Sequence, residues 1–468
     1  MGSSGWALAS SGSAIRLPTC MPLTVLGRRT GLPATPLAGP AGSTFLGVWG
    51  GERPGEALRG LGREPVWEGP DGALTGESAW ESPEGDLVVA GPLVLENALE
   101  LQRALELPET SPPGLVAELY RRDGLAGLSR LRGMFTLALG DRTRRRLYLL
   151  RDGVGARTLY LARRGDRCWF SSRLAILPRC PGISARLSLE ALRAYLVFAY
   201  VPGEMTMWQD VQELRPGTAL LLPEGRRVAL WEPGEGPTGE WEGALHAEQT
   251  EVGEERLPRR DLCLAENAAR LRALLEDAVR LALPERGPAA VYLSGGLDSS
   301  LVTALAARLA PGRISTCSIH FGPQYPNELE HSTLVARHCG TPQEVLGFTG
   351  LQMVEALPET MAALDDPIGD PLTVPNYLMG QAQRGRVEAV LNGEGGDPCF
   401  GGPKNLPMLL HALYEPDQDL ATAYLRAYQK CYDDLPQLLS PGVQRELRSA
   451  PALEEVVAPL LSGGAQAG

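Results

Sequence analysis

Residues 289–305 read AAVYLSGGLDSSLVTAL, and the fold is deduced outward from this stretch. Val291 to Leu293 form a short apolar run bounded by proline and glycine, which is typical of a buried strand. From Asp298 onward the apolar residues recur at helical spacing. We therefore expect a strand, a tight turn and then a helix that enters the core through Leu301, Val302, Leu305 and Leu309.

The turn between the strand and the helix has the chemistry of a phosphate site. Gly295 and Gly296 carry no bulky side chains, so backbone N–H groups can approach an oxyanion closely. The N-terminus of the following helix adds about half a positive charge. Polar side chains complete this phosphate cradle, with hydroxyl donors at Ser294, Ser299 and Ser300 and a candidate ligand for Mg²⁺ at Asp298.

A glycine pair alone is more often only a tight turn between a strand and a helix, but the complete stretch is a much more specific pattern. It does not fit a Walker A loop, because no Gly-Lys pair follows, or a nucleophile elbow, because position 292 is Tyr. It resembles the pyrophosphate loop of ATP pyrophosphatases, the group that holds asparagine synthetases, GMP synthetases and tRNA-thiolating enzymes. The resemblance implies that the loop grips the β and γ phosphates of ATP while a substrate is adenylated at the α phosphate.

Composition bounds the class of protein. The chain has 468 residues, 44% of them hydrophobic and 21% charged, which predicts a globular protein of two domains. No window approaches 18 consecutive apolar residues and the N-terminus lacks a signal-like apolar stretch, so neither a membrane span nor secretion is predicted. The net charge of −12 argues against a nucleic-acid binder. Eight scattered cysteines without ligand spacing argue against zinc and favour a reducing cytoplasm.

The first half predicts a layered, mostly antiparallel domain at residues 1–232. Residues 1–60 show weak periodicity, whereas short strands are expected at 133–139, 146–152, 158–162 and 168–171. Pro112 and Pro113 mark the start of a helix. The arginines 142 and 144–146 flank a strand and predict a solvated hairpin turn.

Three stretches of this half, RLRGMFTLALGD, LLRDGVGARTLYLAR and FSSRLAIL, resemble the amino-terminal glutaminase domain of asparagine synthetases. That resemblance implies an Ntn-hydrolase-like fold over residues 85–232. The family's nucleophile is a cysteine at residue 1 after loss of the initiator Met, whereas Gly2, Ser3 and Ser4 stand here and Cys20 is not terminal. A thiolate paired with its own α-amino group is what attacks the glutamine amide. We therefore expect a degenerate domain that does not hydrolyse glutamine.

The second half predicts a parallel sheet. An acidic, Gly- and Pro-rich linker is expected at 233–262, followed by a domain at 263–468. Strands at 313–319 and 387–391 alternate with helices, one of them at 327–339, as in a sheet covered on both faces. The first helix is expected to bury Leu264, Ala268, Leu271, Leu275, Val279 and Leu283.

Two further loops are expected to lie near the phosphate cradle. Residues 364–380 read LDDPIGDPLTVPNYLMG and crowd Asp365, Asp366 and Asp370 onto one loop. Residues 389–402 read AVLNGEGGDPCFGG, a strand and then a Gly-rich loop. Each alone is commonly a solvated turn. Because carboxylates near a triphosphate need a metal, Asp298 and Asp397 are the expected Mg²⁺ ligands, and Glu394 is the candidate base or substrate orienter.

These loops resemble the S-G-E-G-x-D-E-x-F-G-G and D-E-P-x-x-D-P stretches of asparagine synthetases. Carried over by position, the resemblance implies that Asn392, Gly393 and Ser318 contact the nucleotide and that Glu394 orients the amine. A late catalytic Lys of the family has no counterpart in context, since Lys404 and Lys430 are the only lysines after residue 300.

The resulting hypothesis is an asparagine-synthetase-like protein whose C-terminal domain has the adenine nucleotide α-hydrolase-like fold. It would use ATP and Mg²⁺ to activate aspartate or a similar carboxylate as an acyl-adenylate, which ammonia or an amine then attacks. The alternatives are a degenerate protein that binds ATP or a partner, and an intramolecular amide-closing enzyme of the β-lactam synthetase or lasso cyclase kind. The expected partners are small molecules, with no nucleic acid and no membrane, and a homodimer stays open.

Overall fold

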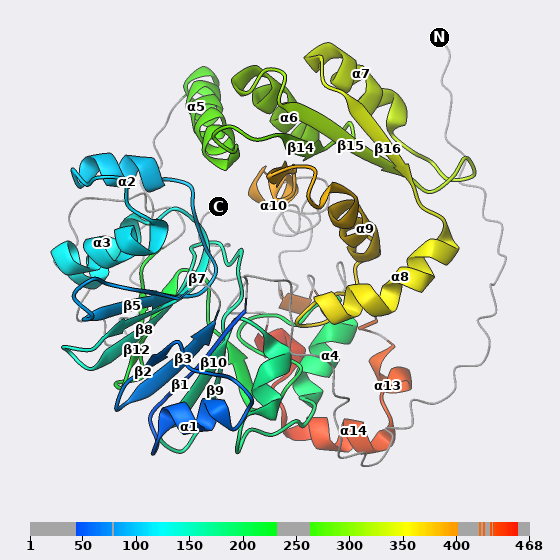
Figure 1. The fold of residues 1–468 in the computed structure, drawn as a ribbon. Coiled ribbons are helices and arrows are strands. Elements are labelled where there is room, and N and C mark those ends of the chain that lie inside the picture. Colours follow the sequence, from blue (N-terminus) through cyan, green and yellow to red (C-terminus); the bar gives the residue numbers. More distant parts are fainter. Residues whose placement is uncertain are drawn as a thin grey trace, which may run out of the picture.

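The computed structural model describes residues 44–76, 79–231, 263–400, 421, 422, 425, 431, 432 and 434–456. Its elements form two groups, one from β1 to β13 and one from α5 to η4 (Figure 1). The predicted linker at 233–262 lies outside the described residues. Cys20, Lys404 and Lys430 lie outside them as well.

Two antiparallel sheets build the first group. One sheet has the strand order β11-β9-β10-β1-β3-β2, with β11 Val211–Glu213, β9 Tyr160–Arg164, β10 Arg167–Ser171, β1 Phe45–Trp49, β3 Gly72–Gly76 and β2 Trp67–Glu68. The other has the order β13-β12-β8-β7-β5-β4, with β13 Arg226–Ala229, β12 Thr218–Leu222, β8 Arg146–Arg151, β7 Gly133–Asp141, β5 Leu87–Ala90 and β4 Trp80–Glu81. The short strand β6, Leu93–Leu95, also pairs with β7.

Alternation along these strands produces a layered core. On β7, Phe135, Leu137 and Leu139 face the helices, whereas Ala138 faces the other sheet. The helices α2 Ala98–Ala104 and α3 Pro112–Gly127 cover this side, with η1 Leu128–Arg130 after α3. On the far side, α1 Pro54–Arg59 and η2 Leu174–Arg179 cover the first sheet. The predicted layered antiparallel domain is confirmed.

Strand β1 was not predicted, because no element was expected before residue 85. All five of its residues are buried, since it lies between β10 and β3 with packed layers on both faces. Gly47 is required at its centre: a β-carbon there would lie 2.1 Å from Cζ of Phe170. The strand therefore reads as a continuous apolar run rather than as an alternating one.

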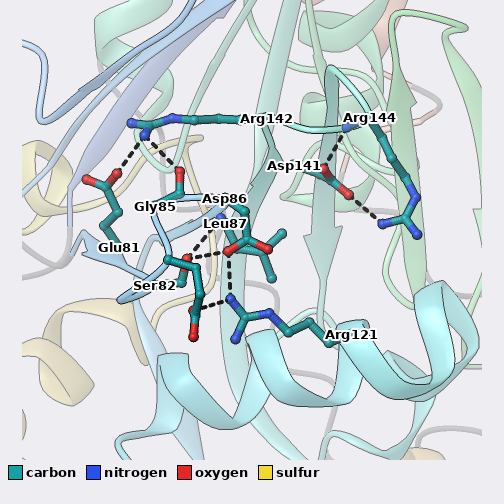
Figure 2. A network of polar contacts seen from close by, with 10 residues as sticks. Glu81, Ser82, Gly85, Asp86, Leu87, Arg121, Asp141, Arg142 and Arg144 are labelled. Atoms are coloured by element: carbon teal, nitrogen blue, oxygen red, sulfur yellow. Dashed lines mark hydrogen bonds and ion pairs between the residues drawn. The ribbon is translucent and has the colours of Figure 1, made fainter.

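The arginine-rich turn between β7 and β8 is a surface hairpin, as predicted (Figure 2). Arg142 donates to Glu81 at 2.6 Å and to the carbonyl of Gly85 at 2.9 Å. Arg144 donates to Asp141 at 2.9 Å. These cations are used in local ion pairs, which makes the cluster a structural feature of this hairpin.

The second group contains a parallel sheet of four strands in the order β16-β15-β14-β17, with β16 Gln343–Gly347, β15 Ile314–His320, β14 Ala289–Tyr292 and β17 Ala389–Leu391. Helices α5 Leu264–Ala282, α6 Leu297–Leu309 and α7 Leu329–Cys339 lie along one face of the sheet (Figure 1). Helix α9, Thr373–Gln383, lies on the opposite face. The predicted parallel sheet with helices on both faces is confirmed.

Two details of the predicted buried faces are wrong. In α5 only Val279 is fully buried, with Leu275 and Leu283 partly buried, while Leu264 is 86% exposed. The cause is that only the last turns of α5 reach the sheet, so Ala268 and Leu271 also stay exposed. In α6 the same core contains Leu305 and Ala306, whereas Leu301 and Leu309 lie on the exposed side and are 43% and 36% exposed.

The remaining described elements connect the two groups. Helix α8, Gly350–Ala363, leads by a loop into α9, and α10 Gly396–Phe400 follows β17. Helix α4, Leu189–Phe198, packs Ala194 and Val197 against residues from the end of the chain: Ala421, Leu425 and Leu453. The short helices α13 Leu435–Leu438 and α14 Pro441–Glu446 lie near α4 (Figure 1), and η4 Leu447–Ser449 follows α14. Within the described part of the chain, no helix is long and apolar enough to span a bilayer.

Candidate functional site

The order of the parallel strands creates a crevice between two loops. The chain passes from β14 outward to β15 and β16 and then returns to β17 on the other side of β14. The loops that follow β14 and β17 therefore leave the sheet side by side at its carboxyl edge. In open α/β sheets this reversal of direction is where ligands bind.

The first loop, Ser294 to Gly296, is pre-formed by its own hydroxyls. Ser294 Oγ lies 3.0 Å from Ser299 Oγ and accepts a hydrogen bond from the backbone N–H of Gly296 at 3.2 Å. Ser299 Oγ also donates to the carbonyl of Gly296 at 3.3 Å. Gly295 has a φ of +98°, which favours glycine at this bend. These hydrogen bonds within the loop hold its shape.

The N-terminus of α6 faces out of this loop. Its N-cap is Gly296, and no side chain caps the first turn, so the helix end is open to an external acceptor. Asp298 lies in that first turn. The Oγ atom of Ser300 is shielded from solvent and has no hydrogen-bond partner among the described residues. Helix end and hydroxyl both lack the acceptor that a phosphate oxygen would supply.

The second loop lies directly against the first. A β-carbon on Gly393 would lie 2.7 Å from the backbone nitrogen of Ser299, and one on Gly396 would lie 2.4 Å from Cγ of Asp298. Asn392 Oδ1 accepts from the backbone N–H of Glu394 at 3.1 Å, which stabilises the turn. Gly393 thus permits a close contact with backbone that any side chain would block, and Gly396 leaves room for the side chain of Asp298. Gly396 was not singled out from the sequence, although the glycines of GEGG hinted at close approach.

Of the two acidic residues predicted in this loop, Glu394 and Asp397, the structure describes the side chain of Glu394 only. Glu394 has an exposed side chain on the loop after β17, where a substrate could reach it. Asp397 belongs to α10 by its backbone, but its side chain lies outside the described part of the structure.

Ser318 supports the site from behind. It is 3% exposed, and its hydroxyl donates to the carbonyl of Leu293 at 2.7 Å. The Nε2 of Gln343 donates to Ser318 Oγ at 2.9 Å and to Ser332 Oγ at 3.1 Å. The side chain of Ser318 is therefore committed to the protein, where it joins the end of β14 to β15.

The acidic loop expected beside the cradle makes its described contacts with the first group of elements. Asp365 accepts from Arg173 Nε at 3.0 Å and from the backbone N–H of Leu174 at 2.8 Å, both in the first group of elements. Asp366 accepts from the backbone N–H of Met207 at 3.1 Å. Asp370 is exposed and accepts from Leu372 N–H at 2.7 Å within its own loop. The partners of Asp365 and Asp366 are distant in sequence, so local patterns could not reveal them.

The residues around the crevice fit a nucleotide triphosphate with its metal. Backbone N–H groups at an uncapped helix end and serine hydroxyls are donors that phosphate oxygens accept. Asp298, beside Gly396, supplies a carboxylate at the same place. Mg²⁺ is commonly held by one or two carboxylates together with the phosphates, so this donor set suits Mg²⁺.

The described cysteines of the first group are poor candidates for a nucleophile. Cys168 and Cys180 are each 3% exposed, inside the layered core. Burial raises the pKa of the Cys180 thiol to about 12 and also raises that of Cys168. Because the thiolate is the reactive form, neither residue is suited to attack an amide at neutral pH.

Comparisons with known proteins agree with this arrangement. Residues 270–456 match the model of the asparagine synthase family, and residues 95–230 match that of the glutamine amidotransferase domain. A protein of Mycobacterium bovis named "Putative asparagine synthetase", glutamine-hydrolysing, is 30% identical over 60% of this chain and 41% of its own length. Glutamine-hydrolysing asparagine synthetase 1 of Bacillus subtilis is 26% identical over 60% of this chain and 42% of its own length. The chain thus spans about two fifths of these relatives.

Proposed function

Because this chain belongs to the asparagine synthase family, with an amidotransferase domain followed by an asparagine synthase domain, we propose that it forms an amide bond at the expense of ATP. The observation that carries the proposal is the contact between the two loops, where Gly393 and Gly396 bring the second loop onto the start of α6. The family accounts for ATP and for amide formation. The substrates and the roles of individual residues are our proposal.

The proposed reaction has two steps. A carboxylate oxygen of the substrate attacks the α phosphorus of ATP, a P–O bond forms, and pyrophosphate leaves with the bridging oxygen. The lone pair of ammonia or an amine then attacks the acyl carbon, a C–N bond forms, and the bond to AMP breaks. The nitrogen gives up one proton to a base. Aspartate or a similar carboxylate is the proposed substrate.

The phosphates would be held by the first loop and the start of α6. Here the donors are the backbone of Gly295 and Gly296 and the hydroxyls of Ser294, Ser299 and Ser300, of which Ser300 Oγ is unpartnered within the described residues. Asp298 and Asp397 would hold Mg²⁺, which when bound offsets the charge of the phosphates. Asn392 and Gly393 would contact the nucleotide from the second loop, and Ser318 would hold the sheet behind it.

Glu394 would receive the proton or orient the attacking nitrogen. Its side chain is exposed on the loop that meets α6, and its backbone is held by Asn392. An exposed carboxylate beside the acyl group can accept a proton from the ammonium-like adduct as the C–N bond forms. Glu394→Gln should therefore lower turnover more than it lowers ATP binding.

Ammonia, rather than glutamine, is the proposed direct nitrogen source. The buried thiols of Cys168 and Cys180 give the described part of the first domain no activated cysteine. The same observation is also compatible with an intramolecular amide-closing enzyme, in which the attacking amine belongs to the substrate itself.

Pyrophosphate release tests the proposal. The purified protein would be supplied with ATP, Mg²⁺ and aspartate, then with ammonia or glutamine, and glutamate would be measured in parallel. We expect release with ammonia and no glutamate from glutamine. Glutamate formation would contradict the nitrogen assignment, and no release with any carboxylate in a panel would favour a protein that only binds ATP or a partner.

A further inference from the structure

The loop between α8 and α9, residues 364–372, is attached to the first domain by four hydrogen bonds. Asp365 accepts two of them, from Arg173 Nε at 3.0 Å and from Leu174 N–H at 2.8 Å. Asp366 accepts one from Met207 N–H at 3.1 Å. The backbone N–H of Gly369 donates the fourth to the carbonyl of Ala199, at 2.6 Å. The contacts therefore extend from residue 365 to residue 369 of the loop.

Two of the residues that bind this loop lie at the ends of helices in the first domain. Ala199 is the C-cap of α4 and has a φ of +64°, and Leu174 is the first residue of η2. Asp365 thus accepts from the first backbone N–H of a helix in the other domain, a position where a carboxylate is favoured. Gly369 packs closely on this C-cap, since a β-carbon at 369 would lie 3.1 Å from Cβ of Ala199.

The two carboxylates are enclosed when the domains meet. The side chains of Asp365 and Arg173 are each 17% exposed. Removing charged groups from water is costly unless they are paired, and Asp365 is paired both by a guanidinium and by a backbone donor. Asp366 receives its hydrogen bond from a backbone amide, and burial together with the charge of Asp365 raises its pKa to about 6.

Other charged and titratable groups surround this pair. Glu213 on β11 pairs with Arg151 on β8 at 2.8 Å. Burial raises the pKa of Glu213, and the charges of Asp366 and Asp365 add to that effect. Burial raises the pKa of the Tyr160 hydroxyl on β9, and the negative charges of Asp365, Glu213 and Asp366 add to that effect. The groups around Asp366 are therefore Asp365, Arg173, Glu213, Arg151 and Tyr160.

The attached loop continues directly into a helix that supports the proposed site. Helix α9 begins at Thr373, and a β-carbon on its Gly380 would lie 4.0 Å from the hydroxyl of Tyr292, the last residue of β14. Gln383 of α9 also donates to Glu344 of β16 at 3.0 Å. Tyr292 is two residues before Ser294. A shift of the loop would thus move α9 against the strand that carries the phosphate cradle.

We infer that Asp365 and Asp366 are positioning residues, and that with Arg173, Leu174 and Met207 they form an interdomain clamp holding α9 against β14. The first domain then has a structural part in the ligase site that needs no glutamine chemistry. The kinetic consequence of the clamp rests on the proposed function, whereas its structural consequence does not.

Hydrogen exchange of the full chain tests the structural consequence. We expect Asp365→Ala to increase backbone exchange in the peptide covering α9 at least tenfold relative to wild type. Arg173→Ala keeps the Leu174 bond and should give a smaller increase in the same peptide. Asp277→Asn is the control, because Asp277 is half-buried and pairs with Arg280 on its own helix. Unchanged exchange in α9 for folded Asp365→Ala would overturn the clamp, and so would a change as large in Asp277→Asn.

Two variants of Asp366, one conservative and one not, separate a positioning role from a general effect on stability. Asp366→Asn keeps an oxygen that accepts from Met207, whereas Asp366→Ala removes it. We expect Asp366→Ala to lower kcat about tenfold with KM for ATP within about twofold, and Asp366→Asn to restore kcat. Equal losses in both variants, or a loss confined to KM, would contradict the inference. If wild type shows no ligase turnover, the exchange experiment still decides the clamp, and the proposed function alone fails.

Discussion

The backbone nitrogen of Ser299 and the position of a β-carbon on Gly393 are 2.7 Å apart, closer than a real β-carbon contact allows. Gly393→Ala should therefore push the second loop away from α6 and weaken binding of Mg-ATP at least tenfold, while thermal unfolding changes little. Calorimetric titration measures the affinity. Gly350→Ala is the matched control, because a β-carbon there meets nothing within 4 Å. Wild-type affinity in Gly393→Ala would contradict the role of this contact.

The proposed role of Asp298 as a Mg²⁺ ligand can also be tested. Asp298→Asn keeps the size of the side chain but removes the charge that would hold Mg²⁺, so turnover with Mg-ATP should fall at least about a hundredfold. Circular dichroism should show an intact fold, because Asp298 lies in the first turn of α6 and is only partly buried. Turnover equal to that of wild type would overturn the metal assignment.

Ser318 is predicted to act through stability. Ser318→Ala leaves the carbonyl of Leu293 and the amide of Gln343 each short of a buried partner, which costs about 1 to 3 kcal/mol. Urea unfolding measures this change. Ser315→Ala on the same strand should cost much less, because among the described residues the Ser315 hydroxyl makes only a long hydrogen bond, of 3.5 Å, to the carbonyl of Ala289. Equal losses in the two variants would show that the network around Gln343 is unimportant.

Asp366 makes stability depend on pH in a defined direction. Its folded pKa of about 6 lies above the ordinary value of about 3.9, so the folded state binds the proton more tightly. The resulting stabilisation is complete below about pH 4 and is lost as the pH rises through about 6. Between about pH 5 and 7 wild type should lose about 1 kcal/mol more unfolding free energy than Asp366→Asn. Parallel pH profiles of the two proteins would contradict this.

Local patterns in the sequence were sufficient for the loop at 294–296 and for the strand and helix on either side of it. Ser294 to Ser300 lie at the end of a strand and the start of a helix, as the residue pattern predicted. A pattern of this kind is informative because the strand, the glycines and the helix are contiguous in the chain. The resemblance to asparagine synthetases then linked the cradle to the loop at 392–396.

Other features depend on residues far apart in sequence and were missed. Strand β1 is buried on both faces, so its residues do not alternate, and it lies in a stretch rich in Gly, Ser and Pro. The sequence did not show that Asp365 pairs with Arg173, which is 192 positions away. In α5, Leu264 has the spacing of a buried residue, yet only the later turns of this helix pack into the core. Tertiary packing decides each of these cases.

Oxygen transfer is the most direct test of the proposed chemistry. Aspartate carrying ¹⁸O in its carboxylates would be incubated with the protein, ATP, Mg²⁺ and ammonia, and the AMP formed would be analysed by mass spectrometry. Attack of the carboxylate on the α phosphorus predicts one ¹⁸O atom in AMP for each amide formed. AMP without the label, or ADP in place of AMP, would contradict activation of the carboxylate as an acyl-adenylate.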